Sequence, residues 1–116
     1  MPGNKKDAYV EGLIAPLGLP IAYRQFTPFK DKPVPNPPYL IYYISPENSG
    51  GADYKNLLVQ RTVTVELYTD EPDAALERQL EDALSSVEWT KHEDYIESER
   101  LNMASYEFNY YSKIRR

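Results

Sequence analysis

Cysteine is absent from this chain of 116 residues, and histidine and tryptophan occur once each. The absence of cysteine excludes disulfides, thiolate chemistry and the usual cysteine-rich zinc sites. Long apolar runs are missing too: nothing after the opening MPGNKK is long enough for a signal peptide, and nothing approaches a transmembrane span. We therefore expect a soluble, intracellular protein with no membrane partner. Its length suits a single domain, residues 1–116, with one modest core.

An excess of positive charge is also missing, because the formal net charge is −5. The acidic residues are concentrated from Glu47 onward, whereas the first 34 residues hold more Lys and Arg than Asp and Glu. Binding to nucleic acid needs a basic stripe that neutralises phosphates, so this balance argues against a nucleic-acid-binding domain. Lys113, Arg115 and Arg116 close the chain, and we interpret them as a solvated tail rather than a binding patch.

No set of residues typical of catalysis is present. His92 is the only histidine, and it lies in a strand-like run without a nucleophile motif, which predicts an exposed residue. Its neighbours Glu93 and Asp94 would point to opposite faces of a strand, so they cannot form a carboxylate pair. The acidic run Asp70–Asp73 is explained by helix capping, and Gly50–Gly51 lacks the Lys-Ser/Thr of a phosphate-binding loop. We expect no enzyme activity, cofactor or metal.

Tyrosine is abundant, with eleven residues in 116. A tyrosine ring suits a half-buried strand, and its hydroxyl tolerates a wet boundary. Tyrosine is also enriched where protein subunits pack together. The composition therefore indicates either tyrosines at the rims of a sheet or a surface that binds other subunits, and it does not choose between them.

The region from Val59 to Tyr111 gives the clearest structural pattern. A period-2 strand is followed by a turn at Asp70–Asp73 and a helix with an apolar stripe, for which Asp70 is the expected N-cap and Arg78–Asp82 an expected ion pair. Two more strands, at 89–98 and 101–114, follow with a tight polar turn between them. The core-directed residues expected in these elements are Val59, Val63, Val65, Leu67, Leu76, Leu80, Leu84, Val87, Ala104, Tyr106, Phe108 and Tyr110.

The first half of the chain is less regular. We expect a short helix over 5–15, a strand over 21–26 and an interior strand over 39–44, whose sequence YLIYYI is apolar on both faces. A proline-dense link at 28–38 would be a stiff connection, although Pro35 and Pro38 also match the PxxP spacing of an SH3-type ligand. Residues 45–56 would form a flexible hairpin tip. The whole pattern predicts an α+β fold with a mostly antiparallel sheet of about five strands and two helices packed on it.

The run from Gln60 through Phe108 resembles a family of small proteins encoded by prophages and tailed phages of Gram-positive bacteria. The resemblance lies in VELYTD before the helix, in the helix LE..LE.AL and in YIESERLNMASYEF near the end. It covers about half the chain and points to the tail terminator, or tail-completion, proteins of long non-contractile tails. The resemblance implies a compact α+β sandwich located in the virion, at the tail or neck, and in the host cytoplasm during assembly.

The same resemblance implies the partners. Copies of the chain would close into a ring, expected to be a hexamer, on the last ring of the major tail tube protein. The ring would stop tube growth and dock the head–tail connector or stopper, and genomic DNA would pass through without specific binding, helped by an acidic inner wall. A ring needs heterologous contacts from loops, edge strands and rim tyrosines. The candidate subunit or tube contacts are Asn48, Tyr54, Lys55, Tyr95, Tyr110 and Tyr111.

Two other functions remain open at this point. One is another neck component, such as a head–tail stopper or adaptor. The other is a small monomeric regulator that binds a host protein through the proline-rich link or the hairpin tip.

Overall fold

The computed structural model describes residues 7–26, 34–45 and 58–113, and the side chains of 58, 59, 112 and 113 are outside the description. Two helices and a short 3₁₀ turn accompany five strands, which form a single sheet in the order β1-β2-β3-β5-β4. The elements are α1 (Ala8–Ile14), the 3₁₀ turn η2 (Ala15–Leu17), β1 (Ile21–Tyr23), β2 (Tyr39–Ser45), β3 (Leu58–Thr69), α2 (Ala74–Ala83), β4 (Thr90–Ile96) and β5 (Leu101–Lys113).

The sheet is mixed. Only β1 and β2 run parallel, and every other neighbouring pair is antiparallel. The predicted α+β class with a mostly antiparallel sheet and two helices is therefore confirmed. The expected hairpin between residues 39 and 67 is confirmed as well, since β2 and β3 are antiparallel neighbours from the pair Tyr39–Tyr68 to the pair Ser45–Thr62. The tip that joins them lies outside the described residues.

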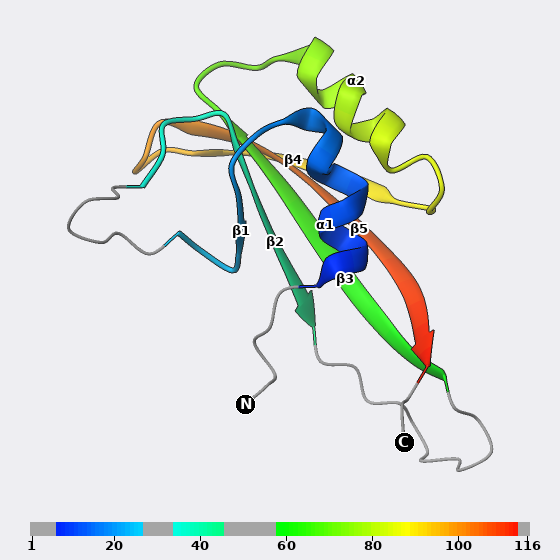
Figure 1. Ribbon diagram of the computed structural model, residues 1–116. Helices are drawn as coiled ribbons and strands as arrows, with labels where there is room; N and C mark the ends of the chain where they lie inside the picture. Colours follow the sequence, from blue (N-terminus) through cyan, green and yellow to red (C-terminus); the bar gives the residue numbers. More distant parts are fainter. Residues whose placement is uncertain (1–6, 27–33, 46–57, 114–116) are drawn as a thin grey trace.

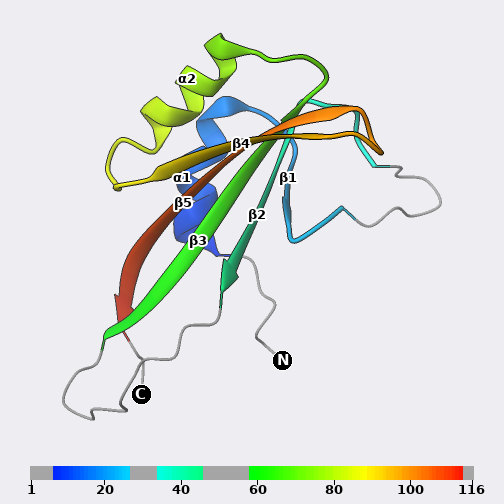
Figure 2. The same ribbon diagram turned by 180° about the vertical axis from the view of Figure 1, so that it is seen from behind.

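Both helices lie on one face of the sheet, and none of the described elements covers the opposite face with a helix (Figures 1 and 2). The core lies between the helices and the sheet, and the predicted period-2 patterns of β3 and β5 supply most of it. From β3, Val63, Val65 and Leu67 are buried, while Thr62, Thr64 and Glu66 alternate to the other side. The buried residues that form one cluster are Val10, Ile14, Leu40, Tyr42, Val63, Val65, Leu67, Leu80, Leu84, Ala104, Tyr106 and Phe108.

The start of α2 corrects the sequence prediction. The N-cap is Asp73 rather than Asp70: the Asp73 carboxylate accepts a hydrogen bond from the backbone N–H of Leu76 at 3.1 Å. Pro72 explains the difference, because a residue that precedes proline is disfavoured in the α region. With Asp70 as the cap, Glu71 would have to be helical directly before Pro72.

The predicted end of α2 and the ion pair predicted within this helix were also wrong. The helix ends at Ala83, so Leu84 is the C-cap and Val87 lies beyond the helix, although both contribute to the core. Within the described ranges all ion pairs involve Lys91, and the expected i+4 pair between Arg78 and Asp82 is not among them. The exposed pair would have gained only about 0.3–0.5 kcal/mol, too little to hold two long side chains in one geometry.

The remaining boundaries were predicted to within a few residues. The first helix starts at Ala8, because Asp7 caps it by accepting from the N–H of Val10, and residues 1–6 are not described. The first strand ends at Tyr23 instead of 26, because Arg24 has a φ of 74° and leaves the extended region. Strand β4 is shorter at both ends than the predicted 89–98, whereas β5 closely matches its predicted span.

Candidate functional site

A hydrogen-bonded cluster attaches the start of α1 to the sheet. The buried hydroxyl of Tyr42 accepts from the backbone N–H of Asp7 at 2.7 Å and donates to the Glu11 carboxylate at 2.8 Å. From β5, the hydroxyl of Tyr110 donates to Oδ2 of Asp7, whose Oδ1 caps α1. The ring of Tyr110 packs on the ring of Tyr9. Burial, more than the nearby acids, raises the pKa of Tyr42 and of Tyr110 well above the ordinary tyrosine value. Both hydroxyls are therefore neutral donors to carboxylates.

A second cluster attaches α2 to β4. The Lys91 ammonium lies 2.8 Å from carboxylate oxygens of both Glu77 and Glu81, and 3.3 Å from that of Glu93. The hydroxyl of Tyr106, which is buried under α2, donates to Glu81 at 2.8 Å. The hydrogen bond from Lys91 holds the pKa of the Glu81 carboxyl below its usual value. Three of the tyrosines, Tyr42, Tyr106 and Tyr110, thus have a structural role in attaching the helices to the sheet.

The face of the sheet opposite the helices is called the open face here. Alternation along the paired strands brings aromatic, aliphatic and polar side chains together on it, most of them half-buried by their lateral neighbours. Strand register places these residues on it: Tyr39, Ile41 and Tyr43 of β2; Thr62, Thr64, Glu66 and Tyr68 of β3; Met103, Ser105, Glu107 and Asn109 of β5; His92 and Asp94 of β4.

Beyond one end of the sheet, β3 and β5 continue as a two-stranded ribbon. Strand β2 ends opposite Thr62 and β4 begins opposite Glu107, so Leu58–Arg61 pairs only with Tyr110–Lys113. This segment is called the terminal ribbon. Its two outer edges have no strand neighbour among the described residues, and Figure 1 shows it projecting past α1. An unpaired edge presents backbone N–H and C=O groups that another chain can bind.

At the other end of the open face, a cavity of about 310 Å³ lies beside the β4–β5 turn. Three aromatic rings from separate segments form one wall: the Tyr39 ring is stacked on that of Tyr68, with centroids 5.3 Å apart, and the Phe26 ring meets it edge-on at 5.1 Å. Glu99 also lines the cavity, and the Tyr68 hydroxyl donates to Glu66 at 2.7 Å. Burial is the main cause that raises the pKa of Tyr39 and of Tyr68, and the negative charge of Glu99 adds to it.

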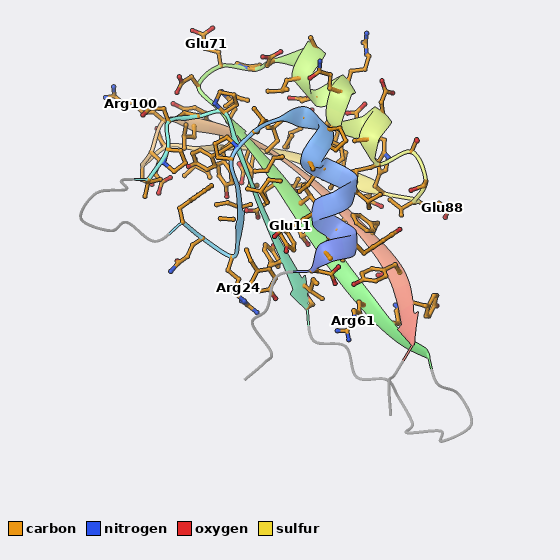
Figure 3. All side chains as sticks on the ribbon, viewed as in Figure 1. Glu11, Arg24, Arg61, Glu71, Glu88 and Arg100 are labelled. Carbon is orange, nitrogen blue, oxygen red and sulfur yellow. The ribbon has the colours of Figure 1, made fainter. Side chains whose placement is uncertain are left out.

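Apart from the two clusters described above, the charged side chains that Figure 3 labels are spread over the molecule. Figure 3 shows Glu11 between α1 and the sheet, Arg24 and Arg61 toward one end, and Glu71 and Arg100 toward the other. Of the residues that the structure describes, no three or more His, Asp or Glu side chains form a group that could hold a metal ion. His92 is exposed, as predicted.

Three of the six predicted contact residues are described by the structure, and these three do not come together in one site. Asn48, Tyr54 and Lys55 lie outside the described residues. Tyr95 and Tyr111 are exposed by 51% and 61%, but Tyr111 lies on the open face and Tyr95 on the helix-bearing face. Tyr95 pairs with Asn102, which lies eight residues before Tyr110 on β5. Tyr95 and Tyr110 are therefore about 27 Å apart along the sheet. Tyr110 is half-buried by Asp7 and Tyr9.

The aromatic cavity was not predicted. The tyrosines of YLIYYI gave a partial signal, since Tyr39 and Tyr43 share one face of a strand and Tyr42 the other. Nothing local joins Tyr39 to Tyr68 or to Glu99, because their proximity depends on the register of β2 with β3 and on the β4–β5 turn. Such contacts follow only from the tertiary structure.

Among the helices that the structure describes, none is long and apolar enough to cross a membrane. Comparison of the sequence with protein-family models gave no match, and a search of curated proteins gave none either. The fold and the geometry of its surfaces are therefore the basis for a functional assignment.

Proposed function

We propose that this protein is a non-enzymatic structural component of the head–tail joining region of a phage or prophage virion. Its specific role would be that of a tail terminator, which caps the tail tube as a ring and offers a docking surface to the head connector. The observation that carries the proposal is the open face: a broad layer of half-buried aromatic and polar side chains that neither α1 nor α2 covers. The resemblance of Gln60–Phe108 to tail terminators supports the same role.

The layout of the sheet suits a ring. Its two edges differ, because β1 is a three-residue parallel strand and β4 is a seven-residue antiparallel one. Contacts between two different edges or surfaces of neighbouring copies are heterologous, and heterologous contacts close into rings when the rotation allows it. The terminal ribbon adds two outer edges that have no strand neighbour among the described residues. The major tail tube protein would bind one surface of the ring, the connector or stopper would bind another, and genomic DNA would pass through without specific contacts.

Disruption of the gene tests this role in the phage or prophage that encodes the chain. Loss of a terminator removes the stop to tube growth, so we expect overlong tails without heads in electron micrographs. Tails of normal length next to separate filled heads would instead indicate a stopper or adaptor. Normal virions would indicate a regulator that binds a host protein.

A pair of variants tests the open face itself. Thr64→Arg places a cation at its centre, between Tyr43 and Glu107 in the register, whereas Ser86→Arg makes the same change at an exposed position after α2. We expect complementation with Thr64→Arg to leave tails uncapped and complementation with Ser86→Arg to restore virions. Thermal unfolding should be similar for both purified variants. Normal capping by a folded Thr64→Arg protein would exclude the open face as the contact surface.

A further inference from the structure

The cavity beside the β4–β5 turn combines an aromatic wall with the carboxylate of Glu99, and a second carboxylate, that of Glu66, is hydrogen-bonded to Tyr68 of the wall. Phe26, Tyr39 and Tyr68 form a continuous row of rings, with successive centroids 5.1 and 5.3 Å apart. The volume of about 310 Å³ is about ten times the volume of one water in the liquid and at the lower limit of small-ligand pockets. The cavity can therefore hold a side chain or a small group, but not a folded element.

Among the residues that the structure describes, neither the Glu66 nor the Glu99 carboxylate forms an ion pair with a cation. Glu66 accepts one hydrogen bond, from Tyr68, and Glu99 belongs to the cavity wall. The ion pairs between described residues all involve Lys91, which belongs to the opposite face of the sheet, so no described cation is paired with either carboxylate. Arg24 is close in sequence, but its guanidinium lies over the ring of Tyr23, 5.5 Å from the centroid. Tyr23 pairs with Tyr42 and so faces the helices.

The chemistry of this wall favours a flat cation. Ring faces attract cations within about 6 Å of their centroids, and desolvation strengthens the attraction. A guanidinium group stacks on aromatic faces and also donates two parallel hydrogen bonds to a carboxylate, which an ammonium group cannot do. The charge of the wall and the shape of the cavity are thus complementary to arginine.

We propose that this cavity binds the guanidinium group of an arginine side chain presented by a partner protein. Tyr68 and Tyr39 supply the stacking surface, Glu99 supplies the charge, and the hydrogen bond from Tyr68 orients Glu66. The site does not depend on the virion role proposed above. It would give any partner surface an anchor at one end of the open face.

Titration followed by ¹H–¹⁵N NMR tests the proposal on the full chain. The probe is N-acetyl-arginine N-methylamide, and the matched control is N-acetyl-citrulline N-methylamide, which keeps the shape and loses the charge. We expect saturable shifts of the amides of Tyr39, Tyr68 and Ile96 with the arginine probe, and about tenfold weaker binding of the citrulline probe. Absence of saturable shifts at these residues, or equal binding of the two probes, would overturn the proposal.

Two glutamine variants separate the cavity from general surface charge. Glu99→Gln removes the carboxylate in the wall, and Glu97→Gln removes one from the same turn that does not line the cavity. Both residues are exposed, so both variants are expected to fold, and their unperturbed spectra elsewhere will verify this. We expect Glu99→Gln to weaken binding of the arginine probe about three- to tenfold, with Glu97→Gln unchanged. Equal weakening in the two variants, or equal binding of N-acetyl-lysine N-methylamide, would contradict a specific arginine site.

Discussion

Replacement of Lys91 by methionine tests whether the acidic residues of α2 depend on a single cation. The Lys91 ammonium contacts Glu77 and Glu81 at 2.8 Å and Glu93 at 3.3 Å. Methionine keeps most of the apolar stem of the side chain and removes the ammonium group, with its charge, its donors and its position 5.6 Å from the centroid of the Tyr106 ring. Three carboxylates would then lack the one cation that contacts all of them.

The expected loss follows from the exposure of each pair. The side chains of Lys91, Glu77 and Glu81 are 27%, 19% and 26% exposed, so both short pairs are partly screened by solvent. Partly exposed ion pairs contribute about 0.5–1 kcal/mol each, and the Glu93 side chain, 65% exposed, adds little. We expect Lys91→Met to lower the free energy of unfolding at neutral pH by about 1–2 kcal/mol. For a chain of this length that is a fall in Tm of about 4–8 °C.

The pH dependence has a definite sign. Because Lys91 lowers the pKa of Glu81 in the folded state, the pair stabilises the fold above the unfolded carboxyl pKa, which is about 4.3. That stabilisation is lost as the pH falls through the lowered pKa of the folded state. At low pH the variant's carboxylates also become protonated, which removes their repulsion. The difference between Lys91→Met and the parent protein should therefore be largest near pH 7 and shrink below about pH 4.

Urea unfolding followed by circular dichroism, at several pH values and at two salt concentrations, measures this difference. Arg78→Met is the control, because it removes an exposed cation from α2, the helix of Glu77 and Glu81, where Arg78 has a weaker effect on the pKa of Glu81 than Lys91 has. The prediction would be wrong if Lys91→Met lowered the free energy of unfolding no more than Arg78→Met does. It would also be wrong if the decrease caused by Lys91→Met were the same at pH 3 and pH 7. High salt should make this decrease smaller, as expected for partly exposed pairs.

Three further predictions concern α1 and the tyrosines. Tyr42→Phe removes a hydroxyl that is hydrogen-bonded to Asp7, the N-cap of α1, and to Glu11. Urea unfolding should therefore show a free energy of unfolding lower by about 1–3 kcal/mol. A similar decrease in Tyr43→Phe, on the open face, would contradict this role. Neither Gly12 nor Gly18 has an atom within 4 Å of an added Cβ, but Gly18 has a φ of 71°. Gly12→Ala should therefore stabilise the protein by about 0.5–1 kcal/mol, and Gly18→Ala should destabilise it by about 1 kcal/mol. Shifts of the Tm in the same direction for the two variants would contradict this prediction. Burial raises the pKa of Tyr106 and of the other buried tyrosines, so their contribution to the free energy of unfolding is present in full below about pH 10 and is lost as the pH rises from there toward the raised pKa. In an alkaline titration, tyrosinate absorbance and loss of circular dichroism should therefore rise together. Ionisation of all tyrosines without unfolding would contradict this prediction.

Local patterns in the sequence were enough to predict most of the elements. Alternation along β3 and β5 identified the buried rows correctly, because a half-buried strand needs one apolar side. The apolar spacing of α2 predicted a helix, but the N-cap lies three residues later than predicted, at Asp73, because Pro72 disfavours a helical conformation of Glu71. The end of β1 was also missed, since no sequence pattern announces the left-handed conformation of Arg24.

Composition showed that tyrosine is unusually frequent, but not what each tyrosine does. Tyr42, Tyr106 and Tyr110 bond to carboxylates that attach the helices, whereas Tyr39 and Tyr68 face the opposite side and line the cavity. Which side a residue faces follows from alternation, so this part was in reach of the sequence. Which carboxylate each hydroxyl meets depends on residues up to 103 positions apart.

The sequence by itself determined the class of fold, because hydrophobic period and capping are local properties of the chain. The tertiary structure alone decided that both helices cover the same face, that β1 runs parallel to β2, and that Phe26, Tyr39, Tyr68 and Glu99 meet around one cavity. These arrangements depend on strand register and on long-range packing, in which many weak contacts are satisfied together. No short stretch of sequence contains that information.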